Sequence, residues 1–147
     1  MAAALLVRVG ASIGALPLAD VVETLRPLPL QPLTGAPSYV RGVAVIRGAA
    51  VPVVDLTELL TGTPAAVTRF VTLRVGERRV ALGVEAVVGV QTVEDDRFAA
   101  LPPLLEPARE RTVALGTLDG GLLMLLQTSR SLLDEAARAA DARGGVS

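Results

Sequence analysis

The sequence predicts a mainly β protein built as two small five-stranded barrels that are related by an internal repeat. Short segments rich in valine and leucine recur along the chain, and turns containing glycine separate them. The same order of elements occurs twice. In addition, 51% of the 147 residues are hydrophobic and only 20% are charged, which is typical of a folded domain and not of a disordered chain.

The first half of the chain is predicted to hold three strands, a proline-rich loop, a hairpin and a short helix. The strands are expected at residues 3–9, 12–18 and 20–26, and the hairpin strands at 42–47 and 50–55, with the turn at Gly48 and Ala49. Both hairpin strands are apolar at nearly every position, so we expect both of their faces to be covered. Pro52 lacks an N–H and therefore predicts an edge strand or a bulge. Asp55 is expected to cap a helix over residues 56–60, which Gly62 ends.

The second half follows the same order. Strands are expected at residues 69–75, 78–84 and 86–93, with Gly89 at a bulge. A proline-rich loop over 101–107 precedes a hairpin with strands at 113–118 and 122–127. A C-terminal helix is predicted at about residues 129–142, and Gly144 with Gly145 ends it.

Residues 5–22 align with residues 71–88 without gaps, and the stretch from Gly48 to Leu60 aligns with the stretch that begins at Gly121. Chance similarity between valine-rich strands is the alternative, but the shared order of elements favours a repeat. We therefore predict a single domain over residues 1–147, with one subdomain at about 5–65 and a second at about 66–134. Closing each set of strands into a barrel would remove exposed strand edges, and the two barrels would share an apolar face.

The residue inventory leaves little room for catalysis. Histidine, cysteine and lysine are absent, which excludes the usual zinc sites, nucleophilic triads, Schiff bases and phosphate-binding loops. The net charge of −1 and the aromatic content of 2% oppose nucleic-acid binding. Two interpretations remain for Glu94, Asp95 and Asp96, a hard-cation site or, in our preferred interpretation, a solvated acidic loop. The sequence therefore predicts no enzyme, no cofactor and no metal.

Two charged residues invite a functional interpretation. Arg47 lies beside the turn of an otherwise apolar hairpin, where it either marks an exposed tip or offers a planar donor fork to a partner's carboxylate or carbonyl. Glu23 is either an exposed strand residue or a contact on an edge. The N-terminus lacks the features of a signal peptide, and no apolar run reaches the length of about 20 residues that spans a bilayer. We therefore predict a cytoplasmic protein with no direct membrane insertion.

The motifs themselves suggest a family. Residues 36–56, APSYVRGVAVIRGAAVPVVDL, and residues 70–90, FVTLRVGERRVALGVEAVVGV, resemble the CheW family of chemotaxis coupling proteins. The closing pattern of Leu115-Gly116, Asp119-Gly120 and Leu132-Leu133 fits as well, so that the resemblance covers about residues 5–133. It implies two SH3-like β-barrels related by an approximate twofold axis. It also implies a non-catalytic adaptor that bridges the cytoplasmic tips of chemoreceptors to the regulatory domain of a receptor-coupled histidine kinase, at receptor arrays in the cytoplasm.

The resemblance also implies a site. Val21 and Glu23 match the family's Val-x-Glu, Gly42 matches the glycine of a basic-Gly-Val step, and Arg47 matches the arginine of the hairpin turn. These four positions imply contacts on the receptor side. Two other functions stay open: a divergent CheW-like scaffold that serves pili or development, and a small β-barrel that binds a ligand.

Overall fold

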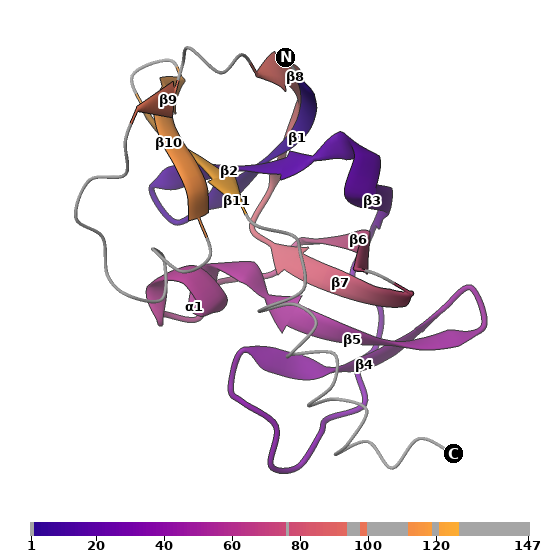
Figure 1. The fold of residues 1–147 in the computed structure, drawn as a ribbon. Coiled ribbons are helices and arrows are strands. Elements are labelled where there is room, and N and C mark those ends of the chain that lie inside the picture. The colour runs from indigo at the N-terminus through magenta and orange to yellow at the C-terminus, as the bar shows by residue number, and fades with distance from the viewer. Residues whose placement is uncertain (1, 76, 94–97, 100–111, 119–120, 127–147) are drawn as a thin grey trace.

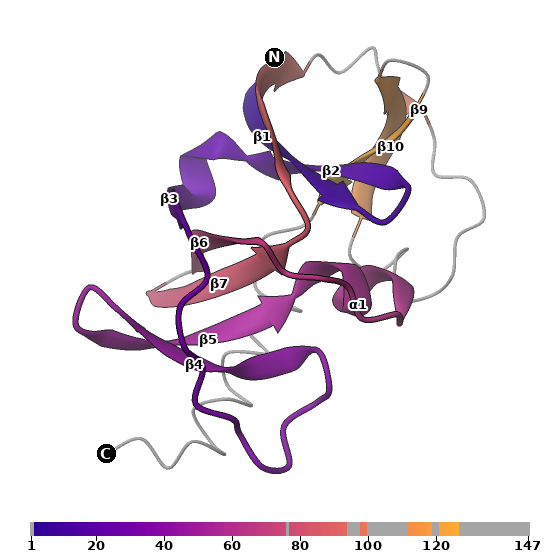
Figure 2. The same ribbon diagram turned by 180° about the vertical axis from the view of Figure 1, so that it is seen from behind.

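The computed structural model describes residues 2–75, 77–93, 98–99, 112–118 and 121–126. These residues form two β-sheets, one above the other in Figures 1 and 2. The helices among them are a 3₁₀ helix, η1 (Leu18–Asp20), and α1 (Leu56–Thr61). Neither of these described helices has the length and apolar character needed to cross a bilayer. The predicted loop over 101–107, the acidic residues 94–96 and the predicted helix at 129–142 lie outside the described residues.

The upper sheet has six strands in the order β8-β1-β2-β11-β10-β9. Its members are β1 (Ala2–Val9), β2 (Ser12–Pro17), β8 (Val87–Val93), β9 (Phe98–Ala99), β10 (Thr112–Leu118) and β11 (Gly121–Leu126). The lower sheet has five strands in the order β3-β6-β7-β5-β4. Its members are β3 (Val21–Leu25), β4 (Val40–Ile46), β5 (Ala49–Asp55), β6 (Arg69–Val75) and β7 (Arg78–Val84).

The strand order confirms the internal repeat. When each strand of the order β8-β1-β2-β11-β10 is replaced by its counterpart in the other half, the order of the lower sheet results. The parallel pair of β11 with β2 corresponds in the same way to the parallel pair of β5 with β7. Even the bulges correspond, because the register shifts at Glu23 in β3 and at its counterpart Gly89 in β8, where a bulge was predicted.

The two halves of the chain exchange their first hairpins. The pair β1–β2 lies in the sheet formed by strands of the second half, and β6–β7 lies among strands of the first half. The subdomain ranges 5–65 and 66–134 therefore describe the halves of the sequence repeat, and each sheet combines segments from both.

The hairpin of β4 and β5 turns one residue earlier than predicted. Ile46 pairs with Ala49, so that Arg47 and Gly48 form the two-residue loop. Their φ angles of 54° and 78° are both positive, as a type I′ turn requires. The prediction that Gly48 and Ala49 form the turn is therefore wrong, because it left the left-handed conformation of Arg47 out of account.

Pro52 lies neither at a sheet edge nor at a bulge, which corrects the prediction made for it. Strand β5 runs between β7 and β4, and its pairing with β7 begins only at Val53. Opposite Pro52, the backbone N–H and C=O of Val43 both bond to Gln31. Val43 and Pro52 are therefore a non-hydrogen-bonded pair, and the missing N–H of proline removes no bond to β4.

The lower sheet packs against apolar side chains on both faces, as predicted for the hairpin strands, except toward the hairpin tip, where Val45, Ala49 and Ala50 are exposed. One face joins the upper sheet and α1 in the main cluster, whose members are Leu5, Val7, Val9, Leu16, Val40, Val54, Leu56, Leu59, Leu60, Val71, Leu73, Val80, Leu82 and Val84. The other face forms a second cluster of Ala44, Ile46, Val51, Val53, Phe70 and Ala81. Leu25, Leu28 and Leu30, which belong to β3 and the segment after it, pack against this second cluster.

Candidate partner-binding site

Arg47 and Glu23 form an ion pair that joins the two edges of the lower sheet. Arg47 lies at the tip of the β4–β5 hairpin, and Glu23 lies on β3 at the opposite edge. The guanidinium donates through Nη2 to Glu23 Oε1 at 3.0 Å and through Nε to Oε2 at 3.2 Å. This geometry presents a planar fork to a carboxylate. The structure thus brings together two of the four residues that the family resemblance singled out.

The ion pair contributes more to the position of the β4–β5 hairpin relative to β3 than to the free energy of folding. The side chain of Arg47 is 71% exposed and that of Glu23 is 26% exposed. Ion pairs at such surfaces contribute little to the free energy of folding. Moreover, Arg47 holds a left-handed φ that glycine or asparagine would adopt more easily. The geometry of the turn alone therefore does not explain an arginine at this position, which favours its interpretation as a binding residue.

The backbone of Glu23 is fixed independently of its side chain. Its N–H donates to Thr72 Oγ1 at 3.2 Å, and the same hydroxyl donates to Glu23 O at 3.3 Å. Thr72 is buried on the neighbouring strand β6, so that the bulge in β3 has a rigid support. The carboxylate of Glu23 is therefore positioned before any partner arrives.

The Arg47 guanidinium lowers the pKa of Glu23, first by its hydrogen bond and then by its charge, against an opposing effect of burial. A carboxylate with a lowered pKa in the folded state stabilises that state above its ordinary pKa, and this contribution is lost as the pH falls through the folded value. We therefore expect Glu23 to titrate at a lower pH than free glutamate in carboxylate ¹³C NMR, and Arg47→Ala to raise its midpoint. Equal midpoints in the two proteins would contradict the ion pair.

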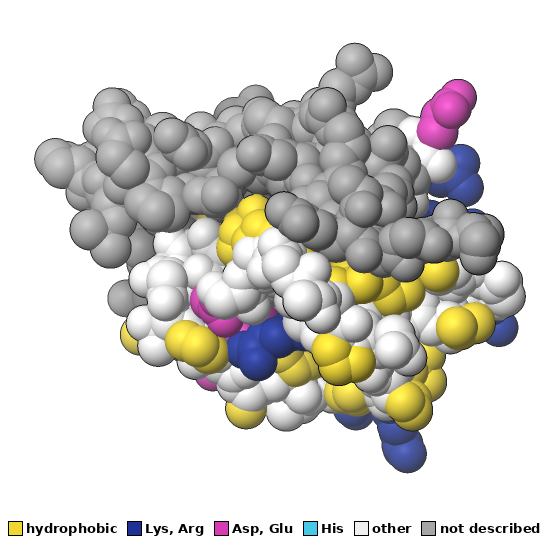
Figure 3. Space-filling model, turned by 90° about the horizontal axis from the view of Figure 1, so that it is seen from below, with side chains coloured by type: hydrophobic (Ala, Val, Ile, Leu, Met, Phe, Trp, Pro, Cys, Tyr) yellow, Lys and Arg dark blue, Asp and Glu magenta, His cyan; other side chains and the backbone are white. Residues whose placement is uncertain are grey.

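Two valines close to the ion pair in sequence are exposed. Val45 is 71% exposed, two residues before Arg47 on the outward side of β4, and Val22 is 40% exposed, next to Glu23 on β3. Figure 3 shows the molecule from below, with hydrophobic side chains in several patches on the described surface. Arginine is among the residue types that are enriched at the hot spots of protein interfaces.

The other two predicted residues lie apart from the ion pair. Val21 is half-buried and packs against the main core cluster. Gly42 is buried, with a φ of 143°, and its backbone lies against the segment that precedes β4. A Cβ at this position would lie 2.5 Å from the carbonyl oxygen of Gln31. The structure thus gives Gly42 a clear role in packing.

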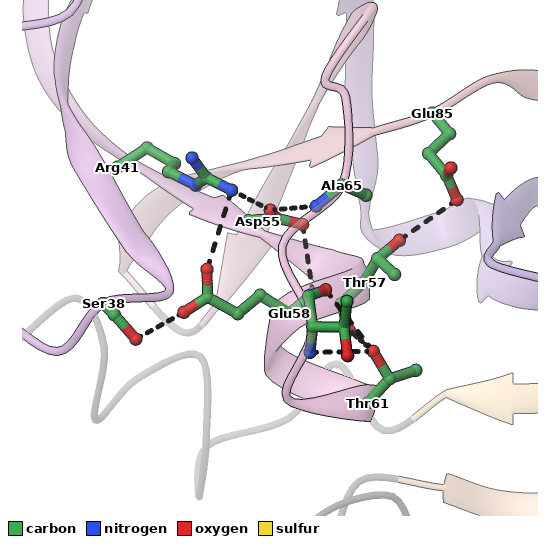
Figure 4. Close-up of polar contacts among 9 residues, drawn as sticks. Ser38, Arg41, Asp55, Thr57, Glu58, Thr61, Ala65 and Glu85 are labelled. Carbon is green, nitrogen blue, oxygen red and sulfur yellow. Dashed lines mark hydrogen bonds and ion pairs between the residues drawn. The ribbon is translucent and has the colours of Figure 1, made fainter.

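A buried polar network surrounds Asp55, which is fully buried at the end of β5 (Figure 4). Its Oδ1 accepts the N–H of Glu58 at 3.1 Å, which confirms the predicted helix cap. Its Oδ2 accepts the N–H of Ala65 at 3.1 Å and a bond from Arg41 Nη2. Asp55 therefore ties the helix, the connector after it and β4 to one another.

Arg41 and Glu58 were not predicted from the sequence to belong to this network. Arg41 Nη2 lies 3.6 Å from Glu58 Oε1, and the hydroxyl of Ser38 donates to Glu58 Oε2. Glu58 is thus part of a buried ion-pair network and does more than complement the helix dipole. The missed signal was Arg41 itself, a lone arginine in an apolar strand, which predicts a nearby carboxylate. The network holds the fold together. Among the described residues, no group of three or more candidate metal ligands occurs.

Two repeated sheets, a buried network that holds them in shape and an exposed charged turn are the features of a β-sheet scaffold protein. The chain belongs to the CheW-like domain family, whose model matches residues 3–136. Members of this family are non-catalytic scaffolds of chemotaxis, which agrees with the predicted lack of enzyme chemistry.

Two relatives support this membership. The chain is 33% identical over 104 residues to the chemotaxis protein CheW of Rhizobium meliloti (strain 1021), a match that covers 67% of this chain and 66%, just under two thirds, of that protein. The structure is similar to that of the scaffolding protein TtCheW from Thermoanaerobacter tengcongensis, with a TM-score of 0.78 at 16% identity. That match covers 87% of this chain and 85% of TtCheW. It shows the fold and confirms the predicted class of two SH3-like β subdomains.

Proposed function

We propose that this chain is an adaptor that couples chemoreceptors to a receptor-associated histidine kinase. The observation that carries the proposal is the match of the CheW-like family model across residues 3–136. The partners would be the cytoplasmic tip of a chemoreceptor and the regulatory domain of the kinase, and the place of action would be receptor arrays in the cytoplasm. A scaffold of the same fold that serves pili or development is the second candidate.

The receptor side of the adaptor is proposed to centre on the Glu23–Arg47 pair. Two features support this choice: the side chain of Arg47 is largely exposed, and the backbone of Glu23 is held in place by Thr72. Val21 would support the same strand from the core side. Gly42 would contribute through the backbone shape that it permits beneath Gln31, because it is itself buried.

Arg47→Ala is expected to weaken binding to a receptor-tip fragment about tenfold, as the loss of one polar anchor commonly does. Isothermal titration calorimetry or fluorescence anisotropy with labelled receptor fragments would measure this affinity. Arg74→Ala is the matched control, because Arg74 is an exposed arginine on β6 in the same sheet. Equal affinity of Arg47→Ala and wild type would remove Arg47 from the proposed site.

A charge exchange separates recognition from shape. In the double variant Glu23→Arg/Arg47→Glu, the intramolecular ion pair can re-form with its charges reversed. If the pair only fixes the hairpin to β3, the double variant will bind as wild type does. We expect it to bind as weakly as Arg47→Ala, because a partner carboxylate would then face a carboxylate at the tip.

A further inference from the structure

The chain crosses between the two sheets at two equivalent places. The first crossing is η1, between β2 and β3, and the second is the segment of Glu85 and Ala86, between β7 and β8. In the internal repeat, Glu85 corresponds to Ala19. At this position, therefore, one crossing carries a carboxylate and the other carries a methyl group.

One carboxylate oxygen of Glu85 contacts groups that belong to segments next to each of the two sheets. Its Oε2 accepts the backbone N–H of Gly10, in the turn between β1 and β2 of the upper sheet, at 2.8 Å. The same oxygen lies 3.4 Å from the hydroxyl of Thr57, which belongs to α1 at the end of β5 of the lower sheet. Figure 4 shows Glu85 and Thr57 pointing toward each other.

The backbone of this crossing is held as firmly as the side chain. Thr68, just before β6, donates its hydroxyl to the carbonyl oxygen of Glu85 and its N–H to Val84 O at 2.9 Å. On the other side, the N–H of Arg8 donates to Ala86 O at 2.9 Å. Hydrogen bonds from both sheets thus converge on two consecutive residues.

We propose that Glu85 is a positioning residue that sets the orientation of the upper sheet relative to the lower one. The main core cluster also joins the sheets, but the hydrophobic effect is itself non-directional. A hydrogen bond from Gly10 has a required direction and therefore selects one arrangement. An adaptor has to hold two binding surfaces in a fixed relation to each other. What this inference says about partner binding therefore rests on the proposed function.

Spin-label distance measurements test the orientation directly. The chain has no cysteine, so Arg74→Cys on β6 and Val90→Cys on β8 give one label on each sheet at exposed positions. We expect Glu85→Ala to broaden the distance distribution about twofold, and Glu85→Gln to keep it narrow, because an amide oxygen can accept the same bonds. Glu77→Ala, at the exposed β6–β7 turn, is the control. A distribution in Glu85→Ala that superimposes on wild type overturns the proposal.

A second variant guards against simple unfolding. Thr57→Val keeps the shape of the side chain and removes only the bond from α1, so we expect a smaller broadening at an unchanged melting temperature. A positioning role would be excluded if Glu85→Ala and Thr57→Val both fold and both give distance distributions as narrow as that of wild type. Glu85→Met keeps the packing volume of the side chain and removes the acceptor oxygen, so we expect it to broaden the distribution as Glu85→Ala does, whereas a mere loss of packing volume would leave it narrow.

The adaptor function is tested separately with the same proteins. We expect Glu85→Ala to bind the receptor tip as wild type does, because the Glu23–Arg47 pair is intact, but to assemble less receptor–adaptor–kinase complex. An equal loss of receptor binding and of assembly would contradict a role in orientation. If wild type binds neither partner, the adaptor function fails, while the distance measurement still decides the role of Glu85.

Discussion

Gly42→Ala is expected to lower the free energy of unfolding by about 3 kcal/mol, measured by urea denaturation. Two effects add at this position. The φ of 143° is strained for any residue with a Cβ, and that Cβ would lie 2.5 Å from the carbonyl oxygen of Gln31. The clash is with backbone, so it cannot be relieved by a side-chain rotation. The segment at Gln31 would have to leave β4, and the two hydrogen bonds between Gln31 and Val43 would be lost.

Gly89→Ala is the matched control for this variant. Its φ of 153° is similar, but a Cβ there would meet no atom within 4 Å. Only the conformational strain applies, and we expect a loss of about 1 kcal/mol. If the two variants lose the same stability, the close approach of Gln31 to β4 does not hold the lower sheet.

Asp55→Asn is expected to destabilise the protein by about 3 kcal/mol, because it places an amide N–H₂ where two donors now converge. The cap at Glu58 can survive through the remaining oxygen. The N–H of Ala65 and the guanidinium of Arg41, however, lose their shared acceptor in a fully buried position. Arg41 is 34% exposed, and partial solvation of its charge limits the loss.

The control for Asp55→Asn is Glu77→Gln, which makes the same chemical change at an exposed turn. Its free energy of unfolding, measured in urea, should equal that of wild type within about 0.5 kcal/mol. Equal midpoints for Asp55→Asn and wild type would show that the network of Figure 4 contributes nothing to stability.

The fold could be predicted from sequence because its signals are local and repeated. Alternating apolar residues placed β6 and β7 at their observed bounds, and Asp55 with Gly62 placed the ends of α1. The repeat predicted that the two halves share the same order of elements along the chain. The exchange of hairpins between the halves was not predictable in this way, because a repeat fixes the order of elements and says nothing of which copy each hairpin joins.

The site was predictable in part. Arg47 was singled out by its place beside a turn and Glu23 by its place on a strand, and the family resemblance pointed to both, but no pattern predicted that the two would meet across the sheet. Residues 24 positions apart come together only when β3 and the hairpin tip curve toward each other. The packing role of Gly42 was hidden for a similar reason, since it depends on where the proline-rich segment returns.

Reconstitution of a receptor-coupled histidine kinase with receptor fragments tests the adaptor role most directly. Kinase autophosphorylation would be measured with receptor alone, with wild-type adaptor and with Arg47→Ala. We predict that receptor-dependent stimulation requires the wild-type chain and is largely lost with Arg47→Ala, while Arg74→Ala behaves as wild type. Stimulation that is the same with and without the wild-type chain would contradict the account.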